Sequence, residues 1–450
     1  MRSKALNICS RWTDVAIILL LFYFQSATSY LDDSGTASTS DRHFALPVFG
    51  QEQSALPELN DEALRVEPVI EGELLFPTSM AFVDNDTLLV TEKNSGNVIS
   101  IINGIIKSEP VLSVEVNNEG FKGLLGITIM DKPSSSSGDR EFVFLYFTEL
   151  YGEDQTRNRV YRYEWDRENE VLVNGTMILD IPAEPESVHN GGKVEADRNG
   201  NLYAVIGDLS RDGQLQNVRQ GPAADDTSVI FRITQNGSGA TDNPFTKDSD
   251  QRMQKYYAYG IRNSFGLAID PISGLLWDTE NGPDSYDEMN IVHPGFNSGW
   301  NRIMGPISHS SIEQADLQED LMIFDGSKYA DPIFSWKDPV GLTDLEFLNS
   351  TALGPEYAYN LFVGDINNGN LYYFELNDER TGIRLDDEDL GDLTDQVADD
   401  QQELSEIILG DGFEEGITDI ETGPDGFLYI LTFNGNIYRI FPVSDERLQG

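Results

Sequence analysis

The chain has 450 residues, of which 39% are hydrophobic, enough for one large domain or for two to three ordinary ones. It carries 77 acidic against 30 basic side chains, so its formal net charge is −47. A surface this acidic repels nucleic acids and anionic membranes, and we expect neither as a partner.

The first 29 residues resemble a secretory signal peptide. A basic start precedes the apolar run at 15–24, and small residues follow at 27–29. The run is shorter than the roughly 20 residues of a membrane-spanning helix. We therefore predict a cleaved signal, a secreted or periplasmic protein and no membrane span in the mature chain, with an uncleaved anchor as the alternative. The single cysteine, Cys9, lies in this segment, so the mature chain would have no disulfide.

After a polar and flexible segment at 30–65, the sequence takes on the character of a β protein up to residue 442. Short apolar or alternating stretches are separated by Asn, Asp and Gly turns. The clearest predicted strands are 87–92, 98–102, 142–149, 159–165, 201–207, 275–280, 361–366, 370–376 and 427–432. The acidic stretch 377–404 is typical of an exposed insertion or linker, and 443–450 of a C-terminal tail.

Four segments share one pattern, in which a strand, an Asp or Asn turn and a second strand follow one another. They are MAFVDNDTLLVTEKNSGNVISI, VEADRNGNLYAVIGD, LAIDPISGLLWDTENG and IETGPDGFLYILTFNGNIYRI. Repeated four-stranded units arranged radially form a β-propeller, with a β-sandwich as the structural competitor. Propellers keep their sites in the loops at one end of the central channel.

The stretch SVHNGGKVEADRNGNLYAVIGD (187–208) contains the first candidate site. His189, one of four histidines, precedes two glycines, and Asp208 stands where a strand should end. The glycines would let the backbone approach a ligand closely. A catalytic base beside a bound ligand is one interpretation, and a histidine in a tight turn is the other.

Two later stretches add candidate ligand groups. In YAYGIRNSFGLAID (257–270), Arg262 and Asn263 offer a cation and an amide that suit an anionic, carbonyl-rich ligand, or a loop carbonyl. In WDTENGPDSYDEMN (277–290), Glu280, Asp284, Asp287 and Glu288 surround Gly282-Pro283. Such hard oxygen ligands suit Ca²⁺, although the spacing is not that of an EF-hand and a solvated acidic loop would look similar. NSGW (297–300) predicts a buried tryptophan that closes a blade.

Together these motifs resemble the soluble quinoprotein glucose/sorbosone dehydrogenases, a family that includes the aldose sugar dehydrogenases. LLGITI, HNGGKV, NLYAVIGD, DNPF, YGIRNSFGLAID, ENGPDSYDEMN, NSGW and GPDGFLYILT occur in the family's order over residues 66–442. The resemblance implies an all-β, six-bladed β-propeller that binds pyrroloquinoline quinone (PQQ) and Ca²⁺ and oxidises sugars or related alcohols. It also implies an external electron acceptor, and it leaves a homodimer open.

The resemblance assigns roles to particular residues. His189 matches the base that takes the proton of the sugar hydroxyl while hydride leaves for the quinone. Asp208 matches an acid that orients this histidine. Arg262 and Asn263 match residues that contact the quinone, and Trp336 resembles an aromatic residue that flanks it.

The same resemblance implies two calcium positions in the loop 280–288. Gly282 and Pro283 match the residues whose carbonyl oxygens bind the active-site Ca²⁺, which acts as a Lewis acid. Asp287 and Glu288 match the acidic end of the loop, where a second, structural Ca²⁺ can bind.

The sequence departs from the family where basic residues grip the quinone. Asn367 or Asn368 stands in place of a late basic residue, and Thr418 lies where arginines are expected. Each charged hydrogen bond lost costs about 1.5–3 kcal/mol. Lys122, Lys193 and Lys337 are the candidates to replace these cations.

Three functions are therefore compatible with the sequence. The first is an exported PQQ- and calcium-dependent sugar dehydrogenase. The second is a calcium-stabilised propeller that lacks PQQ and binds carbohydrate or protein, which the missing cations favour. The third is a propeller lactonase that uses the same histidine and metal to activate water.

Overall fold

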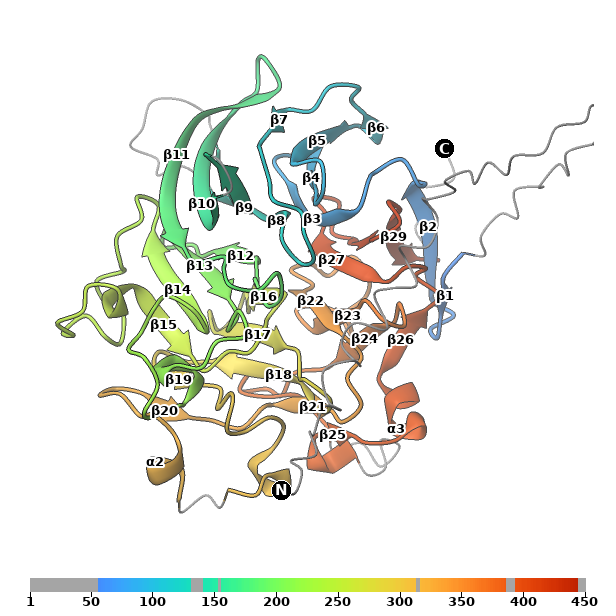
Figure 1. Ribbon diagram of the computed structural model, residues 1–450. Helices are drawn as coiled ribbons and strands as arrows, with labels where there is room; N and C mark the ends of the chain where they lie inside the picture. The colour runs from blue at the N-terminus through green and yellow to red at the C-terminus, as the bar shows by residue number, and fades with distance from the viewer. Residues whose placement is uncertain (1–55, 131–140, 153–154, 313–315, 386–392, 444–450) are drawn as a thin grey trace, which may run out of the picture. The chain divides into compact units, whose positions relative to one another are not determined.

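The computed structural model describes residues 56–130, 141–152, 155–312, 316–385 and 393–443 (Figure 1). The predicted signal peptide, residues 30–55 and the tail from 444 lie outside the described residues. All the described residues belong to one unit of the chain, Ser54–Gly450. Among them, the structure contains no helix with the length and hydrophobicity needed to span a bilayer.

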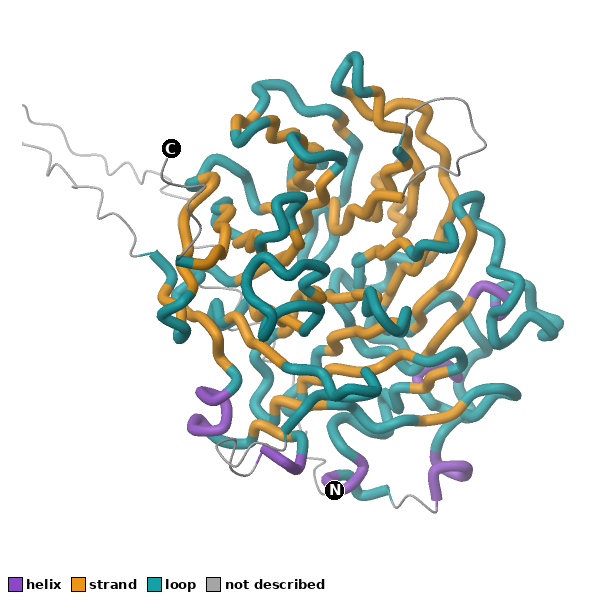
Figure 2. The backbone as a smooth tube through the Cα atoms, turned by 180° about the vertical axis from the view of Figure 1, so that it is seen from behind, coloured by secondary structure: helices purple, strands orange, loops and turns teal. Residues whose placement is uncertain are grey.

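Strands dominate the described chain, and helices are short and lie at its periphery (Figure 2). The helices are α2 (Leu317–Asp320) and α3 (Gln401–Glu406), with 3₁₀ turns at Gln214–Gln216, Met253–Lys255 and Ile307–His309. All nine strands predicted from the sequence are present, with ends that differ by a few residues. They form because β-branched and aromatic residues bury at least one face, as in Leu202–Ile206, which is buried throughout.

The strands of the described residues form six sheets. Three of them have their inner strands before residue 200, and the strands of each sheet are named in the order in which they lie side by side. The first holds β3 (Pro77–Phe82), β4 (Thr87–Glu92), β5 (Asn97–Ile102) and β6 (Ile105–Ile106), with β7 (Leu112–Ser113) beside β5. The second holds β11 (Val171–Ile181), β10 (Gln155–Asp166), β9 (Phe142–Tyr151) and β8 (Leu124–Met130). The third holds β12 (Val194–Ala196), β13 (Asn201–Ile206), β14 (Val229–Thr234), β15 (Tyr256–Tyr259), β19 (Phe296–Asn297) and β20 (Lys328–Tyr329).

The other three sheets come from the second half and from the start of the described chain. The fourth holds β16 (Gly266–Ile269), β17 (Leu276–Glu280), β18 (Asp287–Val292), β21 (Phe334–Trp336) and β25 (Val397–Ala398). The fifth holds β1 (Glu58–Leu59), β26 (Ile408–Asp411), β24 (Leu371–Phe374), β23 (Leu361–Asp365) and β22 (Leu342–Phe347). The sixth holds β2 (Leu64–Ile70), β29 (Ile437–Pro442), β28 (Leu428–Thr432) and β27 (Ile417–Thr422).

One strand of each sheet lies toward the centre, and these inner strands contact one another in a closed ring. In ring order they are β3, β8, β12, β16, β22 and β27, after which β27 contacts β3 (Figure 1). Hydrophobic clusters fill the space between neighbouring sheets. The arrangement is that of an all-β propeller.

The predicted six-bladed propeller of four-stranded units is wrong in this form. Only two of the sheets in the described chain have four strands, and the others have five or six. Long loops return to the outer edges and add short strands there, which covers unpaired edge groups. Three of these added pairings, β15 with β19, β19 with β20 and β21 with β25, are parallel.

Two predicted segments differ from the structure. Strand pairing already begins at Glu58, before residue 66, where the sequence pattern starts the propeller. The acidic stretch 377–404 is not simply an exposed insertion, because Leu393 and Val397 are buried and β25 pairs with β21. Ile383, Leu393 and Ala398 join the aromatic core beside β21, while Asp378 and Asp399 are exposed.

The topology places the candidate residues at one end of the sheets. His189 and Arg262 come just before inner strands, whereas Asp208 and Gly282 come just after the second strand of a sheet. In antiparallel sheets, the start of one strand and the end of the next lie at the same end. The loops that carry these residues therefore meet there.

Candidate functional site

The centre of the candidate site is a histidine–aspartate pair. His189 Nδ1 lies 2.6 Å from Asp208 Oδ1, and the Asp208 side chain is nearly inaccessible to solvent. His189 has a φ of 55°, a left-handed conformation that costs energy for a residue other than glycine and is frequent at functional sites. Because the carboxylate accepts a hydrogen bond from the Nδ1–H group, Nε2 is left unprotonated in the neutral ring and can act as a base.

Asp208 is itself held by two further donors. The backbone N–H of Ser210 donates to Oδ1 over 2.7 Å, and the indole Nε1 of Trp300 donates to Oδ2 over 2.7 Å. Trp300 is half-buried and belongs to this site, so the prediction that it serves as a buried blade anchor is wrong. The loop after β13 thus reaches the segment that follows β19.

Arg262 and Asn263 lie next to this pair, as the sequence predicts. The backbone N–H of Asp208 donates to the Arg262 carbonyl over 2.9 Å. The Arg262 guanidinium lies 5.4 Å from the Trp300 ring centre, and its Nη1 donates to the Asn281 carbonyl over 2.8 Å. Asn263 Oδ1 accepts from the Gly191 N–H at 3.3 Å, which ties the arginine segment to the histidine segment.

The glycines after His189 are explained by packing within the protein, not by the close approach to a ligand that the sequence suggested. A Cβ atom on Gly191 would lie 2.4 Å from the Val205 carbonyl oxygen. One on Gly192 would lie 2.5 Å from the Leu125 Cβ atom. Both glycines also have positive φ values, which side chains disfavour. They let the histidine segment pack tightly between two sheets.

Asp287 holds the Gly282-Pro283 turn in place through hydrogen bonds. Asp287 Oδ1 accepts from the Gly282 N–H over 2.9 Å, and Oδ2 accepts from the Gly341 N–H over 2.7 Å. The carbonyl oxygens of Gly282 and Pro283 accept no hydrogen bond from the described residues. They are therefore free to bind a cation, as the resemblance implies, whereas the Asp287 carboxylate is already used to shape the turn.

Asp287 and Glu288 do not form one metal site with their side chains. Both belong to β18, where successive side chains point to opposite faces of the sheet. Glu288 instead faces Glu280 across the strand pair, with Asp278 and Asn290 as the next pair on that side. The structure therefore separates the two acidic residues that the resemblance placed together.

The face that carries Glu288 is an unusual buried acidic cluster, made of Asp278, Glu280 and Glu288. All three are almost completely buried, and neither oxygen of Asp278 accepts a well-formed hydrogen bond. Burial raises the pKa of Glu280 to about 7 and raises those of Asp278 and Glu288 well above the usual range. Both oxygens of Glu280 accept hydrogen bonds, from the Arg262 N–H and the Ser298 hydroxyl, and Glu288 Oε1 accepts from the Gly305 N–H. The unsatisfied oxygens are therefore those of Asp278, and buried oxygens of this kind fit a cation.

Trp336 does not join the site. Its side chain is 1% exposed, and it packs against Phe334, Tyr372 and Phe374 with ring centres 4.8, 5.4 and 5.8 Å away. A ring surrounded in this way has no free face for a flat cofactor. The aromatic residue that the structure brings to the histidine is Trp300.

The three lysines proposed to replace missing cations are all engaged elsewhere. Lys122 pairs with Glu184 at 3.0 Å, and Lys337 with Asp399 at 3.4 Å. Lys193 is buried between two aspartates. Asn367 is exposed, and Thr418 donates to the Leu431 carbonyl, so neither position supplies a charge.

A cation that the sequence motifs did not reveal is Lys93, which follows β4 at the same end of the sheets. Its ammonium group donates to Asn94 Oδ1 and to the Asn118 carbonyl, at 3.2 and 3.3 Å. No carboxylate of the described residues pairs with it, and burial lowers its pKa to about 8. The sequence TEK does not indicate that Lys93 is a cation without an acidic partner. Only the folded chain shows that no carboxylate of the described residues lies beside it.

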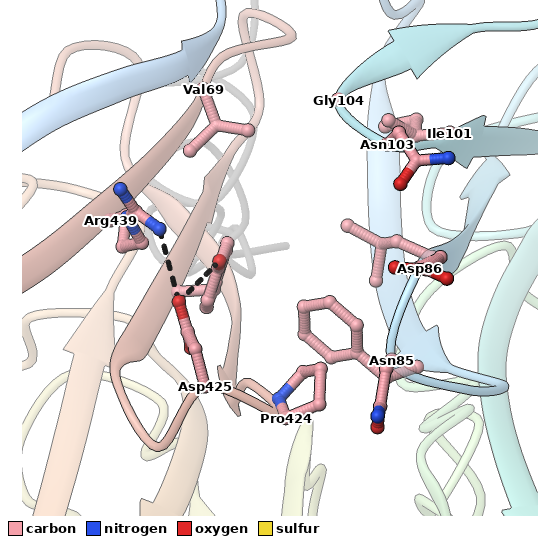
Figure 3. Close-up of a pocket in the computed structure, with 12 residues that line it drawn as sticks. Val69, Asn85, Asp86, Ile101, Asn103, Gly104, Pro424, Asp425 and Arg439 are labelled. Atoms are coloured by element: carbon pink, nitrogen blue, oxygen red, sulfur yellow. Dashed lines mark hydrogen bonds and ion pairs between the residues drawn. The ribbon is translucent and has the colours of Figure 1, made fainter. Parts of the chain in front are cut away.

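A cavity of about 380 Å³ lies elsewhere in the described residues. Asn85 and Asp425 belong to turns that follow an inner strand, which places the cavity at the opposite end of the sheets from His189. Figure 3 shows Arg439 bonded to Asp425 on one side of it. It therefore forms no part of the site around His189.

The comparisons with known proteins agree with this fold. Residues 74–439 match the family model "Glucose / Sorbosone dehydrogenase". The chain is 28% identical to the aldose sugar dehydrogenase YliI of Escherichia coli (strain K12), over 83% of this chain and 92% of that protein. It is 24% identical to the quinoprotein glucose dehydrogenase B of Acinetobacter calcoaceticus, over 53% of this chain and 52% of that protein.

Solved structures show the same fold. The soluble aldose sugar dehydrogenase of Escherichia coli, in its apo form, superposes with a TM-score of 0.63 at 24% identity, over 84% of this chain and 99% of that one. The PQQ-bound aldose sugar dehydrogenase of Streptomyces coelicolor gives 0.60 at 20% identity, over 86% and 99%. Since the family model covers most of the chain, the protein belongs to the glucose/sorbosone dehydrogenase family.

Proposed function

We propose that this protein is an exported dehydrogenase that oxidises aldose sugars or related alcohols with PQQ and calcium. The observation that carries the proposal is the His189–Asp208 pair, joined through hydrogen bonds to Arg262 and Asn263 at one end of the propeller. Family membership supports the same reaction class. Export rests on the signal-like N-terminus, and an external electron acceptor would complete the cycle.

The residues of the site fit the reacting end of PQQ. A guanidinium and an amide suit the carbonyl and carboxylate oxygens of a quinone, and the Gly282 and Pro283 carbonyls suit Ca²⁺. The fit is poorer for the outer carboxylates, since Lys122, Lys193 and Lys337 are paired with acids. Lys93 remains as a cation without an acidic partner among the described residues.

In this proposal, the chain's own residues bind the sugar and move its proton. His189 Nε2 accepts the proton of the sugar hydroxyl, because Nδ1 is committed to Asp208. Asp208 stabilises the imidazolium that forms. Arg262 and Asn263 would donate hydrogen bonds to the quinone oxygens, where negative charge would develop. When bound, PQQ supplies the two-electron acceptor, and Ca²⁺ supplies Lewis acidity.

The first experiment is a titration of the calcium-loaded protein with PQQ, followed by absorbance, and then dye reduction with a panel of aldoses. Tight binding with sugar-dependent reduction is the expected result. Absence of binding at tens of micromolar PQQ would contradict the proposal. The protein would then be tested as a carbohydrate-binding module, which the paired lysines favour, and as a lactonase.

We further propose that a structural Ca²⁺ binds the unsatisfied carboxylate of Asp278, next to Glu280 and Glu288. Chelation with EGTA should then lower the melting temperature by about 5 °C or more, because a tightly bound ion stabilises only the folded state. The pKa values of these acids are raised in the folded protein, so without the ion stability falls as pH rises through about 7. The decrease on chelation should therefore be larger at pH 8 than at pH 6.

Thermal melts followed by circular dichroism measure this effect, with excess CaCl₂ as the restoring control and MgCl₂ as the ion that should restore little. Asp278→Asn should make the melting temperature insensitive to chelator. Identical melting curves with and without EGTA would rule out the structural ion.

A further inference from the structure

Trp300 connects the two halves of the candidate site. Its Nε1 donates to Asp208 Oδ2 over 2.7 Å, and the Arg262 guanidinium lies 5.4 Å from its ring centre. Its carbonyl also accepts from Asn217 Nδ2 over 2.7 Å, and its N–H donates to the Gly260 carbonyl over 3.2 Å. These backbone hydrogen bonds hold the Trp300 residue in place, so its indole does not depend on Asp208 alone for its position.

The bond from Trp300 completes the hydrogen bonding of Asp208. Oδ1 accepts from His189 Nδ1 and from the Ser210 N–H, which leaves Oδ2 to the indole. A carboxylate with donors on both oxygens cannot rotate without breaking a bond, and Asp208 is too buried for water to replace one readily. The indole thus helps to fix the orientation of the carboxylate toward the histidine.

We propose that Trp300 is a positioning residue, which locks Asp208 so that neutral His189 carries its proton on Nδ1 and presents a free Nε2 to the substrate. The inference rests on the proposed function only in one respect, namely that a sugar hydroxyl is the group that gives its proton to Nε2. The same indole borders Arg262 through a cation–π contact, so one side chain fixes both the base and the cation.

The test is the tautomeric state of His189 in the protein without cofactor, measured from ¹⁵N chemical shifts of labelled histidine. The chain has only four histidines, so the signals can be assigned by substitution. In the parent protein the Nδ1–H tautomer should dominate. In Trp300→Phe, which removes the donor and keeps a ring, a substantial fraction should convert to the Nε2–H form that imidazole prefers in water.

The matched control is Trp277→Phe. Trp277 is buried, whereas Trp300 is half-buried. The Trp277 Nε1 has no hydrogen-bond partner in the described residues, so the same substitution removes no bond. It should leave the His189 tautomer unchanged. Asp208→Asn calibrates the full effect, because it removes the negative charge and replaces one of the two acceptor oxygens by an NH₂ donor.

In the loaded enzyme, Trp300→Phe should lower kcat for dye reduction by about tenfold, as misplaced catalytic groups do. The Trp277→Phe variant should keep the parent's rate. The proposal would be overturned if Asp208→Asn shifts the His189 tautomer but Trp300→Phe keeps the tautomer of the parent protein. Because the tautomer is read without PQQ, this outcome is separate from any failure of the dehydrogenase assignment.

Discussion

Substitution of His189 by alanine should reduce sugar-dependent dye reduction by about 10²–10⁴-fold, the usual contribution of a positioned general base. The imidazole is the group at the site whose free ring nitrogen can take the sugar's proton, since its other nitrogen is bound to Asp208. PQQ binding should be much less affected, because Arg262 and Asn263 remain in place. Steady-state rates and a PQQ titration on the same preparation separate the two effects.

His293→Ala is the matched control for that variant. His293 follows β18 at the opposite end of the sheets from His189, and burial lowers its pKa. Loss of this imidazole should leave the rate unchanged and alter the melting temperature only slightly. Activity in His189→Ala equal to that of the control would remove His189 from the mechanism.

The fold was largely predictable from the sequence because each strand carries its own signal. Stretches such as 142–149 and 201–207 are rich in aromatic and β-branched residues, and turns of Asn, Asp and Gly separate them. The short added strands were not predictable. Glu58–Leu59 and Val397–Ala398 are too brief to show a period, and only the edge they meet makes them strands.

The candidate site was predictable for residues whose role follows from the motif itself. It was not predictable for residues whose role depends on a neighbour that is distant in the sequence. His189, Asp208, Arg262 and Asn263 meet as the motifs indicate. Trp300 ends the motif NSGW, but nothing in those letters shows that its indole points at Asp208. A tryptophan's role depends on its neighbours in space, and 92 residues separate this pair in sequence.

Lys193 illustrates the same limit for charges. A lysine four residues after the candidate base suggested a cation for the cofactor, but its ammonium lies 2.8 Å from Asp344 Oδ1 and 2.5 Å from Asp419 Oδ1. All three side chains are buried. Although burial opposes the charge on Lys193, the two carboxylates raise its pKa well above the usual value. The group joins the segment that enters β12 to β22 and β27 across the centre of the ring.

Lys193→Met should therefore destabilise the protein by about 3–5 kcal/mol, the cost of leaving buried charges without a partner. Burial already raises the pKa of Asp419 well above its usual value, and loss of the lysine removes the charge that opposes this shift. An acid whose folded pKa is raised favours the folded state at low pH and disfavours it as pH rises. The loss of stability should thus be smaller at pH 5 than at pH 8.

Denaturant midpoints of the parent and the variant at the two pH values measure this difference. The double variant Lys193→Met/Asp419→Asn, which removes one of the stranded charges, should recover part of the lost stability, whereas Asp419→Asn alone should not stabilise the parent. Equal midpoints for Lys193→Met and the parent at pH 8 would mean that the ion pairs do not hold the ring together. In that case Lys193 would be available to an anionic ligand, as its position in the sequence first suggested.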